Sequence, residues 1–310
     1  MSFLLVTAFD DAYDVGFLCA ASHEAYAQKH GYEQKSWILT PDDFKDLCQG
    51  RAPQWAKVAL LQRLLHAIPG AKAEAVQPSW IVWLDADALL LDFETRLEDL
   101  LEDFDLILAE DMSCASELNT GVMFVRTSST WVATLLDEVW KNADPRWYHR
   151  PFHEQTALSA RLCAVPRGTH ASGTLWWSWQ GGPRRKVLAG RVLVLDCGTL
   201  NFKHPEQRPF AIHLVDDHRR FGGPSKAERV KALLQQPKHQ RGCVAVAAGA
   251  EASCPALVEA RRVWNASIAV PVDVPAASDE LAGADAWCPI PRADANAWDG
   301  CQRPVVLDRW

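Results

Sequence analysis

The stretch WIVWLDADALLLD, residues 80–92, decides the fold. Its first five residues, Trp80–Leu84, are apolar on both alternating faces, which is typical of a central strand covered on two sides. Asp85 and Asp87 follow this strand without a polar break. An ionised carboxylate next to such a core is costly unless it is paired, and two neighbouring carboxylates also repel each other. Because a divalent cation removes both penalties, the stretch predicts a buried strand that ends in a metal site.

The two carboxylates favour one class of cation. At positions i and i+2 of an extended chain, Asp85 and Asp87 are expected to point the same way. Hard oxygen ligands with open positions suit Mn²⁺ or Mg²⁺, which bind through one or two carboxylates together with substrate phosphates, so the expected ligand is a diphosphate. The alternative is that both aspartates are solvated turn residues that close the strand. An EF-hand calcium loop is excluded because Leu89 and Leu90 stand where that loop needs an oxygen ligand and a glycine.

Strands and helices alternate along the chain on both sides of this stretch. Short apolar runs predict strands, and apolar residues at helical spacing predict helices. The predicted strands are residues 2–7, 35–40, 80–84, 106–109, 122–125, 192–195 and 211–214. One predicted helix ends at His30, one begins at Pro53, and others lie near residues 130–141, 153–163 and 225–236. This order indicates an α/β fold with a mostly parallel sheet covered on both faces, whose ligands gather at the carboxyl ends of its strands.

Domain organisation follows from where this pattern ends. After residue 240 the sequence turns to Ala, Pro and small polar residues. We therefore predict one domain over residues 1–240 and a C-terminal appendage of unknown role over residues 241–310.

Four of the nine cysteines gather in the predicted appendage: Cys243, Cys254, Cys288 and Cys301. They could form two disulfides, a question that the sequence leaves open. Their spacings contain no C-x-x-C, which disfavours zinc, and an odd total leaves at least one thiol unpaired in any scheme.

Composition excludes two classes of partner. A formal net charge of −7 provides no basic field for a polyanion, so nucleic acid is not an expected partner. No run approaches the roughly 18 apolar residues of a membrane span, and the apolar stretch at the amino terminus is too short for a signal peptide. The sequence is therefore expected to contain no transmembrane segment and, by default, to be cytoplasmic.

Six segments occur in an order that is characteristic of one enzyme family. They are HEAYAQKHGYE (23–33), PQWAKVALLQRLL (53–65), WIVWLDADALLLD (80–92), LNTGVMFVR (118–126), FHEQTAL (152–158) and FAIHL (210–214). Together they resemble glycosyltransferase family 34, which contains galactosyl-, xylosyl- and mannosyltransferases with the GT-A fold, and the resemblance covers about residues 1–220. It implies a Rossmann-like GT-A sheet and a nucleotide-sugar donor, with a UDP-sugar favoured. Glycosyltransferase family 8 shares the Asn-x-Gly-Val and acidic-Gln features and is the nearest alternative.

The resemblance implies a metal and nucleotide site. Asp85 and Asp87 match the Asp-x-Asp motif of the family, which holds Mn²⁺ and reaches the nucleotide ribose. His213 matches the histidine of the family's His-Phe motif, a further metal ligand; for a lone histidine on an apolar strand, the alternative is a core histidine. Lys57 matches a family lysine that could touch phosphate, and the alternative is a solvated helix lysine.

The resemblance also implies a donor-sugar side of the site. Asn119 corresponds to a polar residue that faces the sugar, and Gly121 lets backbone come close to a ligand. Glu154 and Gln155 match the acidic-Gln pair of retaining GT-A enzymes, which lies on the sugar face away from the leaving diphosphate. In that role Gln155 would stabilise the oxocarbenium-like centre, and a covalent route through Glu154 is the less favoured version. Alternatively, residues 119–121 form a turn that opens a strand, and the acidic-Gln pair is simply the first turn of a helix.

The chain departs from the family pattern at three points. Residues 215–220 (VDDHRR) stand where the family usually has Gly-Cys with a lysine beyond, so Arg219 or Arg220 would have to supply a phosphate contact there. Glu154 replaces the usual aspartate of the acidic-Gln pair. The chain is expected to lack the usual membrane anchor and stem of the family, so a location in the Golgi lumen is expected only if the chain is a truncated family member.

The acceptor and the reaction class leave alternatives open. Trp176, Trp177 and Trp179 lie beside glycines and are candidates for the wall of an acceptor site, since aromatic faces bind sugars. The expected acceptor is a glycan or another hydroxyl compound. The alternatives to a retaining glycosyltransferase are a non-catalytic sugar-nucleotide binding protein and a haloacid-dehalogenase-like phosphatase. The phosphatase is less favoured because its Asp-x-Asp pair lies near the amino terminus and precedes Gly-Thr, whereas Asp85 follows the third predicted strand.

Overall fold

The computed structural model describes the chain over residues 1–67, 77–111, 118–149, 152–163, 185–202, 210–214 and 223–234. All of these residues lie within one compact unit. The predicted appendage, residues 241–310, lies outside the described residues together with its cysteines, so the domain division and the disulfides stay predictions. Among the helices of the described ranges, none is both long and apolar enough to cross a membrane.

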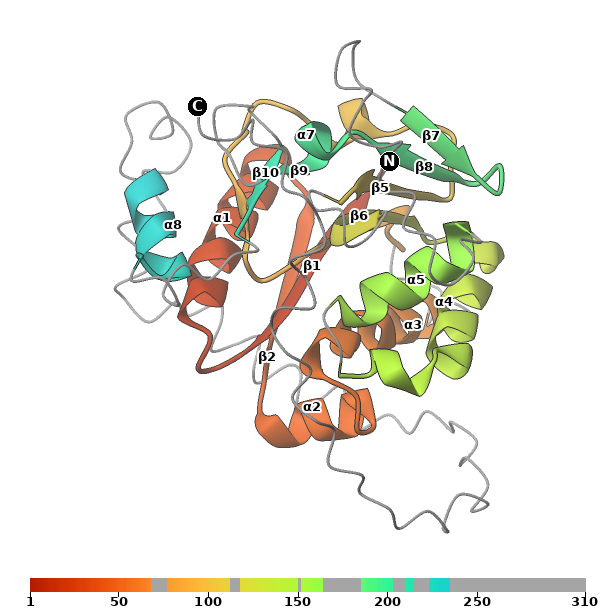
Figure 1. The fold of residues 1–310 in the computed structure, drawn as a ribbon. Helices are drawn as coiled ribbons and strands as arrows, with labels where there is room; N and C mark the ends of the chain where they lie inside the picture. Colours follow the sequence, from red (N-terminus) through yellow and green to blue (C-terminus); the bar gives the residue numbers. More distant parts are fainter. Residues whose placement is uncertain are drawn as a thin grey trace, which may run out of the picture. The chain divides into compact units, whose positions relative to one another are not determined.

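The centre of the fold is a seven-stranded sheet with helices on both faces (Figure 1). Its strand order is β2-β1-β3-β6-β5-β8-β7. The strands are β1 (Phe3–Asp10), β2 (Glu33–Leu39), β3 (Trp80–Leu84), β5 (Leu106–Glu110), β6 (Leu118–Arg126), β7 (Arg185–Leu188) and β8 (Val192–Leu195). All except β6 and β7 run in the same direction. This arrangement confirms the predicted α/β fold with a mostly parallel sheet.

Strand β3 is central, as its sequence predicts. All five of its residues are buried, with β1 on one side and β6 on the other. Its side chains alternate between two separate cores: Ile81 and Trp83 belong to one, and Trp80 and Val82 belong to the other. A strand covered on both faces requires this continuous apolar run.

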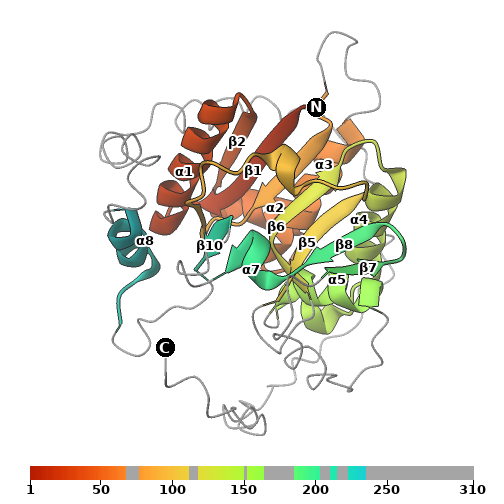
Figure 2. The same cartoon turned by 90° about the horizontal axis from the view of Figure 1, so that it is seen from above.

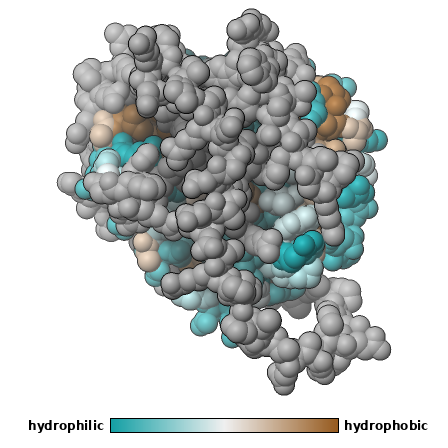
Figure 3. All heavy atoms as spheres, in the orientation of Figure 1, coloured by the Kyte–Doolittle hydropathy of each residue, from teal (hydrophilic) through white to brown (hydrophobic). Residues whose placement is uncertain are grey.

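The helices divide between these two cores (Figure 2). The core that contains Trp83 is completed by α2 (Pro41–Cys48), α3 (Ala56–Ala67), α4 (Thr130–Asn142) and α5 (His153–Cys163). The core that contains Trp80 is completed by α1 (Asp14–His30), the short α7 (Cys197–Leu200) and α8 (Lys226–Leu234). Three 3-10 turns, η1 (Pro53–Trp55), η2 (Leu97–Leu100) and η3 (Pro145–Trp147), connect these elements. With the large apolar side chains inside, the described surface visible in Figure 3 is mainly hydrophilic, with small separate hydrophobic areas.

A smaller three-stranded sheet packs against α1. Its order is β4 (Ala88–Leu90), β10 (Ala211–His213) and β9 (Asn201–Phe202). Two side chains of α1 bind its first strand: Ser22 Oγ accepts from Leu90 N at 3.2 Å, and His23 Nε2 donates to Ala88 O at 2.7 Å. Because β4 begins directly after Asp87, α1 fixes the chain that follows the aspartates.

Helix α2 is an element that sequence analysis does not predict. Pro41 reads as the residue that closes the preceding strand, but it begins a helix capped by Thr40. Thr40 Oγ1 accepts from Asp43 N at 3.2 Å, and Asp43 Oδ2 accepts from Thr40 N at 2.8 Å. This reciprocal capping box satisfies donors that a helix start otherwise leaves unpaired.

Strand β6 begins earlier than predicted, and strand β4 has no predicted counterpart. Strand β6 begins at Leu118 and includes residues 119–121, so the alternative that these residues form a turn is wrong. Strand β4 is only three residues long, which is too short for periodicity to reveal.

Candidate active site

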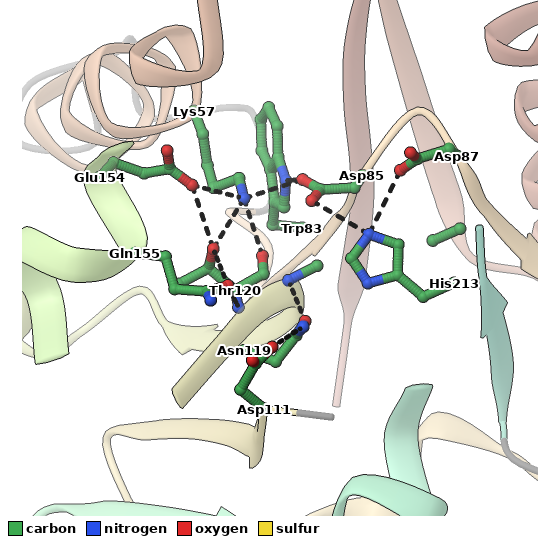
Figure 4. Close-up of polar contacts among 12 residues, drawn as sticks. Lys57, Trp83, Asp85, Asp87, Asp111, Asn119, Thr120, Glu154, Gln155 and His213 are labelled. Carbon is green, nitrogen blue, oxygen red and sulfur yellow. Dashed lines mark hydrogen bonds and ion pairs between the residues drawn. The ribbon is translucent and has the colours of Figure 1, made fainter. Parts of the chain in front are cut away.

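Two aspartates and a histidine meet where β3 ends (Figure 4). The chain turns after Asp85, with Ala88 N donating to Asp85 O at 2.9 Å, so the expected extended arrangement of the aspartates is wrong. His213 arrives from β10, where it pairs with Ala88 in the antiparallel ladder, and Leu214 N donates to Asp87 O at 2.9 Å. His213 Nε2 lies 3.5 Å from Asp85 Oδ2 and 3.2 Å from Asp87 Oδ1. The structure thus brings the three predicted metal ligands together, with their ligand atoms all within 4.8 Å of one another.

Each aspartate pairs its other oxygen with a lysine. Asp85 Oδ1 lies 2.8 Å from Lys57 Nζ. Asp87 Oδ2 lies 2.5 Å from Lys226 Nζ, at the start of α8. The oxygens that face His213 are therefore the ones left for a cation. Two carboxylate oxygens and one imidazole nitrogen fit Mn²⁺ or Mg²⁺, and binding at these atoms would retain both lysine pairs.

Burial and charge oppose each other in this cluster. Burial raises the pKa of Asp87 and lowers the pKa of His213. The hydrogen bond and charge attraction between these two residues outweigh burial, and Lys226 adds to the effect on Asp87. The net pKa of Asp87 is below its usual value, and that of His213 is above. Each of these two residues therefore favours the charged form of the other.

Lys57 lies at the centre of the site. It is only 5% exposed, so the alternative of a solvated helix lysine is wrong. Its Nζ lies 2.8 Å from Asp85 Oδ1 and 3.0 Å from Glu154 Oε1, and it donates to O and Oγ1 of Thr120 at 3.0 Å each. Burial lowers the pKa of Lys57, but the two carboxylates raise it by more. Four acceptors surround its three N–H groups, so Lys57 joins the Asp85, Asp87 and His213 cluster to α5. Its contact with phosphate stays a prediction.

Glu154 and Gln155 are buried in the first turn of α5 and both contact β6. Glu154 Oε1 accepts from Thr120 Oγ1 at 3.1 Å, and Gln155 Oε1 accepts from Thr120 N at 3.1 Å. Because a backbone N–H can only donate, this contact fixes which end of the Gln155 amide is the oxygen. Gln155 Nε2 is buried and has no hydrogen-bond partner among the residues that the structure describes. A buried amide with unused donors is costly unless a ligand accepts from it.

The backbone just before this pair is strained. Phe152 has φ 67° and His153 has φ 30°, both in the left-handed region that favours glycine. Such conformations cost on the order of 1–3 kcal/mol each and often occur at functional sites. Here they lead directly into the turn that carries Glu154 and Gln155.

Asn119 and Gly121 belong to the part of β6 that faces the cluster. Asn119 Oδ1 accepts from Gly121 N at 2.8 Å, and Asn119 Nδ2 donates to Asp111 Oδ1 at 2.9 Å. Gly121 O accepts from Asp85 N at 2.8 Å. A Cβ at position 121 would lie 2.3 Å from His213 Cε1, so the group that approaches this glycine is the imidazole ring. The contacts of Asn119 with a donor sugar and of Gly121 with a ligand stay predictions.

Tyr13 also belongs to the site, because its hydroxyl donates to Asp87 Oδ2 at 3.2 Å. Sequence reasoning missed several residues of this site: Trp83, Asp111, Thr120, Tyr13 and Lys226. The resemblance gave a signal for the last of these, because the family has a lysine beyond the His motif. Arg219 and Arg220, the substitutes considered from the sequence, lie outside the described residues, as do Trp176, Trp177 and Trp179.

Part of the chain matches the model of a known protein family. The model of glycosyltransferase family 34, described as the galactosyl transferase GMA12/MNN10 family, matches residues 18–113. The predicted resemblance to this family is confirmed. The matched range includes Asp85 and Asp87, whereas the family 34 segments that contain Asn119, Gln155 and His213 lie beyond it.

Two curated proteins of Schizosaccharomyces pombe are similar to parts of the chain. An uncharacterized alpha-1,2-galactosyltransferase is 23% identical over 176 residues, which cover 46% of this chain and 43% of that protein. An alpha-1,2-galactosyltransferase is 34% identical over 74 residues, which cover 24% of this chain and 17% of that protein. The chain thus spans less than half the length of these curated relatives.

One solved structure supports the fold. It is a glycosyltransferase involved in the glycosylation of the major capsid of PBCV-1. The two chains are 16% identical, the match covers 76% of this chain and 100% of that chain, and the TM-score is 0.51. This likeness concerns the fold alone and agrees with the GT-A architecture that the family 34 resemblance implies.

Proposed function

We propose that this chain is a glycosyltransferase that depends on a divalent cation. It transfers a hexosyl or pentosyl unit from a nucleotide sugar, with a UDP-sugar favoured, to a hydroxyl group of a glycan or another acceptor. One observation carries the proposal: Asp85 Oδ2, Asp87 Oδ1 and His213 Nε2 converge, and the Lys57 network joins them to Gln155, whose buried N–H groups have no partner in the described part of the chain.

The cation side of the site would serve the leaving group. Mn²⁺ or Mg²⁺ at these three residues would neutralise the charge that develops on the departing diphosphate. The ammonium group of Lys226 pairs with Asp87 Oδ2, the oxygen that the cation would not use, and provides a further positive charge at this end of the site. We infer that its amino group contacts the diphosphate, in the place of the family lysine.

The reaction that fits a retaining enzyme is a single exchange of bonds at the anomeric carbon. The bond from this carbon to the diphosphate oxygen breaks, and a bond to the acceptor oxygen forms on the same face. The acceptor proton passes to a diphosphate oxygen. No side chain has to donate a proton to the leaving group, so the residues of the chain act by binding and orientation.

The hydrogen bonds of Gln155 suggest how it contributes. Its oxygen accepts from Thr120 N, which leaves its N–H groups as the part available to a ligand. We therefore propose that Gln155 donates to an oxygen of the donor sugar and orients the ring. Glu154 uses Oε1 to hold Lys57 and Thr120, which favours a positioning role over the covalent route.

The family match and the fold favour a glycosyltransferase over the phosphatase. A test with three readouts separates all the candidates. The chain is incubated with UDP-sugars, GDP-sugars or sugar phosphates, with Mn²⁺ or with EDTA, and release of nucleotide, release of phosphate and binding of UDP are measured. We expect Mn²⁺-dependent nucleotide release that Asp87→Ala abolishes and Asp103→Ala, a change at a fully exposed aspartate, leaves intact. Phosphate release from sugar phosphates would indicate a phosphatase, and UDP binding that survives both EDTA and Asp87→Ala would indicate a non-catalytic binding protein.

A further inference from the structure

Asp85 has one oxygen that is bound by two donors from different elements. The indole Nε1 of Trp83 donates to Oδ1 at 2.7 Å, and Nζ of Lys57 lies 2.8 Å from the same atom. The other oxygen, Oδ2, faces His213 Nε2. The rotation of this carboxylate is therefore defined by contacts to the oxygen that the predicted cation would not use.

Of the two donors, Trp83 is the more directional. Its ring is buried in the core formed with α3, with only 3% of the residue exposed, and it lies two residues before Asp85 on β3. An indole has a single N–H with a fixed direction, whereas the ammonium of Lys57 rotates and is shared among four acceptors. Lys57 supplies charge to Asp85, and Trp83 supplies orientation.

We propose that Trp83 is a positioning residue for the cation site: its N–H holds Asp85 so that Oδ2 faces the point shared with Asp87 and His213. This proposal rests on the proposed function, because it requires that Asp85 binds a cation. Groups that orient metal ligands through hydrogen bonds typically change metal affinity by about 10- to 100-fold when they are removed.

A matched pair of variants tests the proposal on the full chain. Trp83→Phe removes the N–H donor, and Trp80→Phe makes the same change on the same strand, in the opposite core and without a contact to Asp85 among its described interactions. Binding of Mn²⁺ alone is measured by electron paramagnetic resonance and by calorimetry. We expect Mn²⁺ affinity to fall about tenfold in Trp83→Phe and to stay within about twofold of wild type in Trp80→Phe.

A second replacement separates orientation from packing. Benzothienylalanine at position 83 keeps the shape of the indole but has sulfur in place of the N–H. The benzothienylalanine protein should retain the thermal stability of the wild type and show the same loss of Mn²⁺ affinity as Trp83→Phe. If Trp83→Phe does not fold, the benzothienylalanine protein takes its place in the test.

Three outcomes would overturn the proposal. Wild-type Mn²⁺ affinity in the benzothienylalanine protein would show that the N–H does not matter. An equal loss in Trp80→Phe would show that the effect comes from packing in general. Absence of Mn²⁺ binding by the wild type would overturn the proposed function and, with it, the role of Trp83, which distinguishes the two failures.

Discussion

The imidazole ring of His213 occupies the space that a side chain on Gly121 would need. A Cβ at position 121 would lie 2.3 Å from Cε1 and 2.5 Å from Nδ1 of that ring. Position 121 lies within strand β6, so the glycine is required by close approach rather than by a turn. The predicted cation site therefore depends on a residue that does not bind the cation itself.

Gly121→Ala should displace His213 and lower Mn²⁺ affinity to nearly the same extent as His213→Ala. The reason is that the new methyl group and the ring cannot occupy the same space. Calorimetry on the two single variants and the double variant forms a thermodynamic cycle. We expect the double variant to bind Mn²⁺ no more weakly than His213→Ala; additive losses would contradict the idea that the two changes act through the same ring.

Lys57→Met should destabilise the fold strongly, because it leaves the half-buried carboxylate of Asp85 and the buried carboxylate of Glu154 without the ammonium group that they share. Removing one partner of a buried charge pair typically costs about 3–5 kcal/mol of unfolding free energy. Urea unfolding at neutral pH measures the loss. The matched control is Lys29→Met, which breaks a pair with the exposed Glu94 and should cost less than about 1 kcal/mol. Similar losses in the two variants would mean that the Lys57 network does not stabilise the protein.

Gln155→Ala should lower turnover by about 10- to 100-fold while UDP affinity stays near that of the wild type, because the lost contact is with the sugar and not with the nucleotide. Asp87→Ala should lower both quantities. Steady-state kinetics and calorimetry separate them. A Gln155→Ala protein with normal turnover would show that the role belongs to another residue.

Gln155→Glu distinguishes two roles for this side chain. It keeps an oxygen that can accept from Thr120 N but removes the N–H donors. If Gln155 acts by donating to a sugar oxygen, turnover should fall as far as in Gln155→Ala. Turnover equal to or above that of the wild type would instead favour stabilisation of a positive reacting carbon by the side-chain oxygen.

His23 should make the fold sensitive to acid. Burial lowers its pKa from 6.5 to about 4, against a smaller opposing effect of its hydrogen bond to Ala88 O. Because the unfolded chain binds a proton near pH 6.5 and the folded chain does not, stability is full above pH 6.5 and falls as the pH drops toward 4, by about 2–3 kcal/mol. Urea unfolding between pH 7.5 and pH 4.5, at points of about one unit, measures this slope.

His23→Gln is the control, since an amide keeps a donor for Ala88 O but does not titrate in this range. The variant should lose stability less steeply with falling pH than the wild type. Equal slopes would show that His23 is not the group responsible.

Much of the fold is predictable because its signals are local. The apolar run of β3 is readable because a strand covered on both faces cannot carry polar residues, and α5 is readable from helical spacing within its own eleven residues. The predicted bounds of both elements agree with the structure. Helix α2 is not predicted, because its eight residues are too few for a clear periodic pattern. The stronger sequence signal for this helix is the Thr40 capping box.

The site residues also divide into those with a local sequence signal and those without one. Asp85 and Asp87 stand out because they follow an apolar strand directly, and His213, Asn119, Glu154 and Gln155 were found through resemblance rather than through spacing. Trp83 gave no separate signal, since a tryptophan in an apolar run is ordinary core.

By itself, the sequence determined a central strand that is followed by two carboxylates. All five residues of Trp80–Leu84 are apolar, and only a strand that is covered on both faces buries such a run. Only the tertiary structure decided which groups those carboxylates meet. The partner of Asp87, Lys226, is 139 positions away, and Lys57 is 97 positions from Glu154. Periodicity reports which residues share a face of one element, whereas contacts at these separations depend on how the strands and helices pack together.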